Sequence, residues 1–178
     1  RSRLGRDLLD HVAAVQPAPG QRDPPGRNTS SYESGFYGTP CLLWYAGLAV
    51  AGEGIDDPRA RDFAEKGHAL HVKLLEHRRR AAGDDGGSAS PALNYALVAY
   101  PWAEFNFFHT YRSAFGRDVA SEWPHVALLA NYALWNRLPG DRWFGSGDAY
   151  HREEDDAIPP GEMLYHLDHI RYFFGATQ

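Results

Sequence analysis

The chain has 178 residues, which is enough for one domain with a buried core. Its net charge of −5 argues against a nucleic-acid partner, because no basic stripe is available to displace counterions from phosphates. No apolar stretch is long enough to cross a bilayer, so we expect no membrane partner. A single cysteine, Cys41, excludes an internal disulfide and a cysteine-based zinc site.

The first 52 residues predict two helices separated by a long loop. Apolar residues from Leu4 to Val15 recur at helical spacing, and Leu9 and Val12 lie on the same face as Leu4 and Leu8. Residues 16–35 are rich in Pro, Gly and Ser and predict a loop, and loops of this length are often lids or rims.

The second helix is expected to begin at Thr39-Pro40, a capping residue followed by proline. Cys41 lies in this apolar helix, and the sequence places no base near it.

Helical patterns continue through the rest of the chain. Asp57-Pro58 begins a charged helix, whose predicted buried stripe is Phe63, Gly67 or His68, Leu70, Leu74 and Leu75. Later helices are predicted within ALNYALVAY, PWAEFNFFHTYRSAFGRD, SEWPHVALLANYALWNRLPG and PPGEMLYHLDHIRYFFG, with stops at Pro139-Gly140 and Gly175. No segment alternates with a period of two, so the sequence predicts an all-α fold.

The aromatic residues of segment 101–118 do not fall on one stripe, which is typical of a helix with neighbours on both sides. We expect its core to be Trp102, Phe105, Phe107, Phe108 and Phe115. Polar groups between these rings must pair with one another or line a cavity. The pattern favours an incomplete (α/α) toroid of stacked helical hairpins, forming a single domain over 1–178 that is part of a longer chain.

Two segments carry residues suited to sugar binding. The first holds Glu104, Asn106, His109 and Tyr111, with Asn94, Tyr95 and Tyr100 just upstream, because rings stack on sugar faces and polar tips bind hydroxyls. The second is the glycine-rich stretch 138–153, with Trp143, Asp148, Tyr150 and His151, whose spacing does not match a phosphate-binding loop. The alternatives are polar residues that satisfy one another inside a helical core, and a plain loop with a capping aspartate.

Glu162, His166 and His169 share one stripe of the last predicted helix. Three ligands on one straight helix rarely converge on one ion, so we expect a paired helix face and no metal or cofactor; a metal-dependent helical enzyme is the third hypothesis. The absence of a Gly-x-Ser-x-Gly elbow argues against a serine hydrolase.

The order of several segments resembles the α/α-toroid domain of heparinase II/III-like polysaccharide lyases. These segments are PCLLWYAGLAVAGEGIDDPRA, a charged helix, Asp85-Gly86-Gly87, a tyrosine-containing helix start, RSAFGRD and LPGDRWFGSGD. The resemblance covers most of residues 31–151 and implies β-elimination on an acidic polysaccharide, with a tyrosine as acid and base. Tyr95 stands nearest to the family's tyrosine and Tyr100 second, and Asp148 corresponds to its loop aspartate.

The family's Asn or His element before Cys41 is replaced here by ESGFYGTP, so Asn94 or His109 would neutralise the substrate carboxylate. We therefore expect a lyase-like domain that binds a uronic-acid-containing polysaccharide or oligosaccharide and, if it is an enzyme, cleaves it. We expect it to act outside the cell or in the periplasm, beside further domains of the same polypeptide. The alternative is a non-catalytic carbohydrate-binding or scaffold domain. The expected catalytic residues are Tyr95, Tyr100 and His109, and the expected substrate-binding residues are Asn94, Trp102, Glu104, Arg112, Trp143, Asp148 and His151.

Overall fold

The computed structural model describes residues 2–16, 39–87, 96–97, 100–138, 142–143 and 160–175. The loop predicted for 16–35 lies outside these residues, apart from its first one. The described elements are helical except for one short ladder, which agrees with the all-α prediction. The chain divides into two compact units, Arg1–Leu74 and Leu75–Gln178, and each is described by itself.

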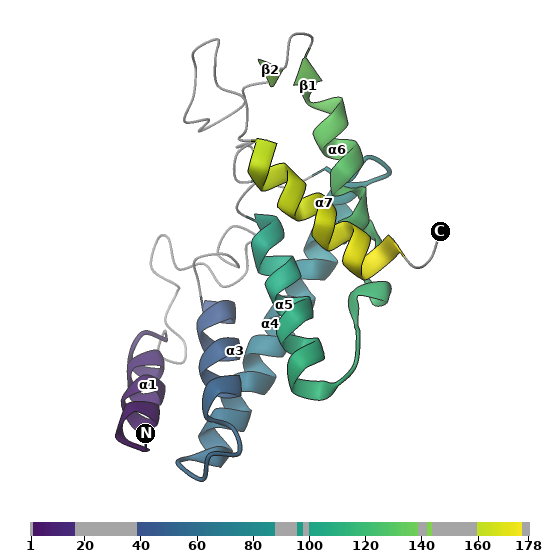
Figure 1. Cartoon of the computed structure of the whole chain (residues 1–178). Helices are drawn as coiled ribbons and strands as arrows, with labels where there is room; N and C mark the ends of the chain where they lie inside the picture. Colours follow the sequence, from purple (N-terminus) through teal and green to yellow (C-terminus); the bar gives the residue numbers. More distant parts are fainter. Residues whose placement is uncertain are drawn as a thin grey trace. The chain divides into compact units, whose positions relative to one another are not determined.

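The first unit contains α1 (Ser2–Ala14), α3 (Thr39–Val50) and the first part of α4 (Asp57–Ala82), as Figure 1 shows. Both α3 and α4 begin where Thr-Pro and Asp-Pro predicted a start. The Asp57 side chain also closes the turn before α4, because its Oδ1 accepts hydrogen bonds from the backbone N–H groups of Gly52 and Gly54 at 3.1 and 3.2 Å.

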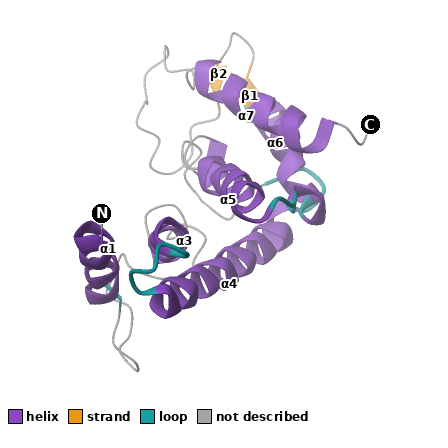
Figure 2. Ribbon diagram, turned by 60° about the horizontal axis from the view of Figure 1, so that its bottom comes forward, coloured by secondary structure: helices purple, strands orange, loops and turns teal. Residues whose placement is uncertain are grey.

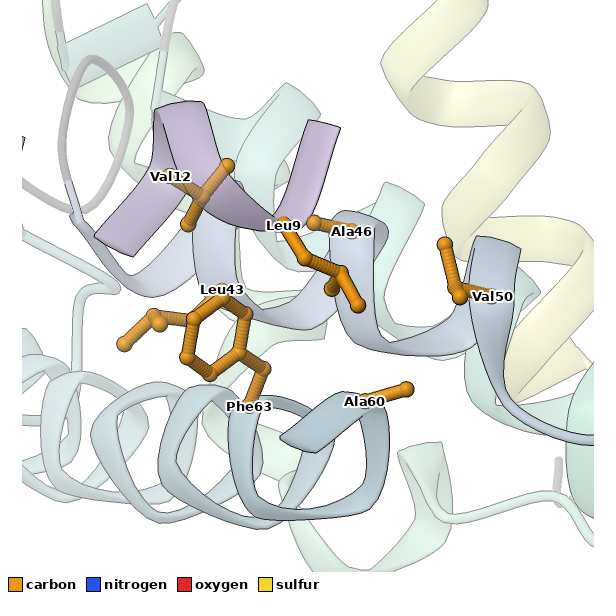
Figure 3. Close-up of a cluster of buried hydrophobic side chains, with 7 residues drawn as sticks. All are labelled: Leu9, Val12, Leu43, Ala46, Val50, Ala60 and Phe63. Carbon is orange, nitrogen blue, oxygen red and sulfur yellow. The ribbon is translucent and has the colours of Figure 1, made fainter. Parts of the chain in front are cut away.

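The core of the first unit is a cluster of aliphatic residues around one phenylalanine. Figure 3 shows side chains of α1 directed at α3, with Ala60 and Phe63 of α4 beneath them. The cluster consists of Leu9, Val12, Leu43, Ala46, Val50, Ala60 and Phe63. Leu4 and Leu8 lie on the predicted apolar face of α1, but they are 74% and 37% exposed. Helix α1 packs chiefly against α3, which covers only a narrow stripe of that face.

Helices α3 and α4 approach each other closely at two glycines. A Cβ on Gly67 would lie 2.5 Å from the backbone nitrogen of Trp44, and a Cβ on Gly47 would meet the backbone of Ala60 and Ala64. Gly67 is buried and His68 is half-buried, so Gly67 is the member of the predicted stripe that faces α3. The absence of side chains at these two points lets the helix backbones touch.

The second unit begins with the end of α4, which is closed by a glycine turn. The N–H groups of Gly86 and Gly87 both donate to the carbonyl of Ala82, at 2.9 and 3.0 Å. Gly86 has a φ of +78°, and a Cβ there would collide with the backbone of Leu128. Gly86 of the Asp85-Gly86-Gly87 string therefore has a structural explanation within this chain's own packing.

The remaining helices of this unit are α5 (Tyr100–Phe115), α6 (Leu129–Trp135) and α7 (Pro160–Phe174), with 3₁₀ segments η2 (Ala120–Glu122) and η3 (Pro124–Leu128). One continuous helix was expected from Ser121 onward, and that prediction was wrong. Trp123 leaves the helical conformation, with φ −126° and ψ 55°, and Pro124 starts a new turn. Helix α7 was predicted correctly.

Strands were missed by the sequence analysis. Strand β1 (Arg137–Leu138) pairs antiparallel with β2 (Arg142–Trp143), Arg137 opposite Trp143 and Leu138 opposite Arg142 (Figure 2). Two residues per strand are too few to show an alternating pattern.

The interior character predicted for α5 is confirmed in its middle and wrong at its end. Phe105, Phe107 and Phe108 are at most 1% exposed. Trp102 is half-buried, and Phe115 is 56% exposed. Phe115 is the last helical residue, next to the turn at Gly116. Its ring packs on Tyr111, one helical turn earlier, with the ring centroids 4.8 Å apart, and does not enter the core.

Candidate functional site

The structure describes the side chains of four predicted site residues, all on α5: Trp102, Glu104, His109 and Arg112. Tyr100 is the first residue of α5 and Trp143 the last of β2, but their side chains lie outside the described part. Asn94, Tyr95, Asp148 and His151 lie outside the described residues altogether. The predicted catalytic tyrosines therefore stay predictions, and the site is built from α5 and its neighbour α7.

His109 lies against a stripe of rings on α7. Its imidazole is stacked on Tyr172 with centroids 5.4 Å apart, meets His169 edge-on at 5.1 Å, and contacts Phe173 at 4.6 Å. The three α7 residues are spaced i, i+3 and i+4, so they share one face of that helix. One α5 side chain is thereby held by three rings of α7.

Arg112 follows His109 by less than one helical turn. Its Nη1 donates a hydrogen bond to the Tyr172 hydroxyl at 2.7 Å, and its guanidinium carbon lies 5.2 Å from that ring's centroid. On its other side, Nη1 lies 3.9 Å from Oδ2 of Asp118, and the side chains of Arg112 and Asp118 are 48% and 38% exposed. Arg112 is thus positioned but still accessible to a ligand.

Trp102 continues the same arrangement at the start of α5. Its ring centroid lies 6.3 Å from Tyr165, 5.2 Å from His166 and 5.3 Å from His169. Ten residues of α-helix separate Trp102 from Arg112, a length of roughly 15 Å. We call the exposed and half-buried side chains along this length the α5–α7 face; its members are Trp102, His109, Arg112, Tyr165, His169 and Tyr172.

Burial and neighbouring positive charge lower the pKa of His109. Burial is the larger cause, followed by His169 and Arg112, and Asp118 partly opposes them. His169 donates from Nδ1 to the Tyr165 carbonyl at 2.6 Å, which leaves the lone pair of its neutral form on Nε2. The face therefore holds one permanent cation and two imidazoles, one of which resists protonation.

Glu104 lies in the interior of the second unit. It is 5% exposed, and its Oε1 is 3.7 Å from Nε of Arg78, which is fully buried. His125 is also buried, and burial together with Arg78 and Arg79 lowers its pKa to about 4 against a weaker opposing effect of the Leu75 carbonyl. A buried ion pair of this kind suits a structural role, so sugar binding by Glu104 stays a prediction.

The metal hypothesis gains nothing from the described residues. His166 is fully buried among the rings of Trp102 and Phe105, at 5.2 and 5.9 Å, whereas His169 lies at the half-buried edge of α7. In the part of the chain that the structure describes, no group of three or more His, Cys, Asp or Glu is arranged to hold an ion.

The first unit contains a thiol–imidazole pair that the sequence analysis missed. Nδ1 of His71 donates to the Gly67 carbonyl at 2.8 Å, so its Nε2 is the acceptor facing Sγ of Cys41 at 3.8 Å. The expectation that Cys41 has no base nearby was therefore wrong. His71 follows Gly67 by one turn, and this position on the stripe facing α3 was the available signal.

This pair is not an activated nucleophile. Burial raises the pKa of the Cys41 thiol to about 11 and lowers that of the His71 imidazole to about 4, so both partners are neutral around pH 7. A nucleophilic cysteine requires the opposite, a thiolate favoured by its surroundings. The Cys41–His71 contact is thus a partly buried hydrogen bond between neutral groups.

A cavity of about 290 Å³ also lies in the first unit. Its lining is mostly apolar, with Leu4, Leu8, Val50 and Ile55 around a single carboxylate, Glu53. Such a lining lacks the convergent polar groups that sugar hydroxyls need, so it does not correspond to the hollow expected beside α5.

Comparison of the chain with family models, with curated proteins and with solved structures found no match. The resemblance to heparinase II/III-like lyases therefore stays an interpretation of segment order. Among the described residues, no helix has both the length and the apolar character needed to span a membrane.

The site also includes residues that the sequence analysis did not select. Tyr165 and Tyr172 are both more than half exposed and flank the α5 residues along α7. The aromatic and histidine spacing in LYHLDHIRYFF was the available signal. The sequence alone did not show that this stripe packs against α5.

Proposed function

We propose that this chain is a helical domain that binds a uronic-acid-containing glycan on the α5–α7 face. The observation that carries the proposal is the convergence of Arg112, His109 and Tyr172 at one end of a face whose other end is aromatic. A uronic acid offers a carboxylate, hydroxyls and an apolar ring face. Arginine binds the first by forked hydrogen bonds, and tyrosine and tryptophan suit the other two.

The second part of the proposal is cleavage by β-elimination, in an incomplete (α/α) toroid acting outside the cell or in the periplasm beside further domains of the polypeptide. Its support is the resemblance described above. A tyrosinate removes the C5 proton, the C4–C5 double bond forms, and the C4–O bond to the leaving sugar breaks as that oxygen takes a proton. Tyr95 is the first candidate for this tyrosine and Tyr100 the second.

In this proposal Arg112 and His109 bind the carboxylate, which lowers the cost of forming negative charge beside it at C5. Arg112 is suited to that task because it is exposed on one side and already oriented by the Tyr172 hydroxyl. The alternative is a domain that binds without cleaving. It is favoured by the composition of the described face, whose side chains are binding groups, while Tyr95, the first candidate for the acid and base, belongs to another segment.

The experiment incubates the chain with a panel of acidic glycans and one neutral glycan. Cleavage is read from the ultraviolet absorbance of unsaturated uronate products, and binding from calorimetry. We expect Tyr95→Phe to abolish cleavage and keep binding, and Tyr132→Phe on α6 to change neither. Binding without product supports the non-catalytic alternative. Equal binding of neutral and acidic glycans, or no binding of either, contradicts the proposal.

A further inference from the structure

Three nitrogen-bearing side chains gather at the Arg112 end of the α5–α7 face. His109 and His169 are 5.1 Å apart between ring centroids, and Arg112 bonds the tyrosine on which His109 is stacked. None of the three is fully buried. Cations that share so small a region repel one another unless an anion lies among them.

We propose that His109, Arg112 and His169 form a subsite for a single carboxylate or sulfate group, and that this subsite binds more tightly as the pH falls. The inference rests on the proposed function only in assigning that anion to a glycan. The subsite itself would also take a free anion of the same kind.

The direction of the pH effect follows from the surroundings of His109. Burial, His169 and Arg112 lower its pKa in the free protein, so its ring is mostly neutral at pH 7. An anion beside the ring favours the protonated form and raises that pKa. Binding therefore takes up a proton, and linkage makes affinity increase as the pH falls between the bound-state and free-state pKa values.

Asp118 is the carboxylate that competes with such a ligand. Its Oδ2 lies 3.9 Å from Nη1 of Arg112, and it is the neighbour that raises the pKa of His109. Its Oδ1 accepts the backbone N–H of Ala120 at 2.9 Å, which fixes the side chain at the start of η2. An incoming anion must share Arg112 with this fixed negative charge, which weakens binding at neutral pH.

An anion fits this cluster better than a metal ion does. Arg112 is permanently positive and acts electrostatically on His109, so it repels a cation from that imidazole. The other groups around His109 are the neutral rings of Tyr172 and Phe173. Asp118 is already shared with Arg112 and the Ala120 N–H, so it is a poor ligand for a metal ion.

The test is calorimetric titration of the intact chain with sodium sulfate and with glucuronate, at about pH 5.5 and about pH 7.5. We expect binding on the order of tenfold tighter at the lower pH, with proton uptake seen as a dependence on buffer ionisation heat. Arg112→Gln should remove binding at both pH values. Arg171→Gln, which changes an exposed arginine of α7 outside the subsite, should leave binding unaltered.

Two further variants test the charges of the subsite while keeping the packing around them. His109→Phe keeps a ring against Tyr172 and should make binding less dependent on pH, because it removes one of the two imidazoles of the subsite. Asp118→Asn keeps an oxygen for the Ala120 N–H and should tighten anion binding at pH 7.5. Far-ultraviolet circular dichroism of each variant verifies folding.

The results distinguish this inference from the proposed function. Acid-strengthened sulfate binding without any glycan binding would support the subsite and contradict the function. Glycan binding whose affinity is independent of pH, or unchanged in His109→Phe, would overturn the subsite and leave the function standing. Failure of Arg112→Gln to weaken anion binding would also overturn it.

Discussion

His71 in the first unit and His109 in the second both have a lowered pKa, but only His109 can be reached by a ligand. Burial is the largest cause of a lowered pKa in both. His71 is 3% exposed and both of its ring nitrogens face partners, the Gly67 carbonyl and the Cys41 thiol. His109 is half-exposed and faces an accessible arginine and a second imidazole. The comparison teaches that a perturbed pKa indicates a binding site only where a ligand can reach the group.

The two units also differ in how they are packed. The first relies on glycine and aliphatic residues that let helices touch, whereas α5 and α7 in the second interlock large rings. The first kind of interface fails when atoms are added, and the second when atoms are removed. Both expectations can be measured.

The largest effect is expected for Gly67→Val. Its Cβ would lie 2.5 Å from the Trp44 nitrogen and 2.7 Å from the Trp44 Cα, so the two helices must move apart. We expect a loss of more than about 3 kcal/mol in the free energy of unfolding, measured in urea. Ala69→Val, on the exposed side of α4, should cost under about 1 kcal/mol. Equal losses would contradict the close approach of α3 and α4.

Phe108→Ala should destabilise the second unit by roughly 3 to 5 kcal/mol, because the ring is fully buried against Phe173 and Phe174. Phe115→Ala on the same helix should cost less than about 1 kcal/mol, because that side chain is 56% exposed. Urea unfolding of both variants checks the difference. A larger loss for Phe115→Ala would show that the sequence-based core assignment was right after all.

Acid should weaken the first unit through His71. Its pKa is about 4 in the folded protein and near 6.5 in the unfolded chain, so the unfolded chain binds more protons between these values. Stability is therefore lost as the pH falls from 6.5 toward 4, by about 3 kcal/mol in total. His71→Gln should remove this contribution to the pH dependence of the melting temperature. An unchanged pH dependence would show that His71 is not sealed from protons.

His109 is expected to make a smaller contribution of the same sign to the pH dependence of stability. Its pKa is also lowered, so it too favours unfolding as the pH falls, but the ring is half-exposed and solvent weakens the effect. The slope of melting temperature against pH should change less in His109→Gln than in His71→Gln. The reverse order would invalidate the contrast between the two histidines.

The last prediction concerns the reactivity of Cys41 and needs no substitution. Its raised pKa, about 11, leaves little thiolate at neutral pH, and burial restricts access. We expect alkylation by iodoacetamide to be on the order of 100-fold slower in the native protein than in the unfolded chain. Native and unfolded rates that agree would mean that α3 does not hold the thiol against His71.

Local signals located the starts of two helices. Thr39-Pro40 and Asp57-Pro58 located the starts of α3 and α4, because a cap followed by proline acts within one turn. The break at Trp123-Pro124 was missed, because the apolar spacing on both sides still fitted one helix. The contacts between helices could not be predicted from local signals. Cys41 and His71 are thirty residues apart, and nothing in the sequence near Cys41 indicates that His71 faces it.

The candidate site was predicted in part for the same reason. Trp102, His109 and Arg112 could be selected from α5 by residue type, since rings, imidazoles and guanidinium groups suit acidic sugars. Tyr172 could not be selected, because its role depends on a hydrogen bond with Arg112, which is sixty residues away in the sequence. Phe115 was assigned to the core by composition, but the helix ends at that residue.

The glycine turn that closes α4 has a consequence for evolution. Gly86 is held by backbone shape and by the proximity of Leu128, so any side chain there is penalised whether or not the protein binds anything. Selection for a stable helix end would preserve Gly86 even in a relative that had no enzymatic activity. Finding a glycine at this position in a related protein would then indicate a shared way of ending a helix, and any reaction would have to be inferred from the side chains that contact the ligand.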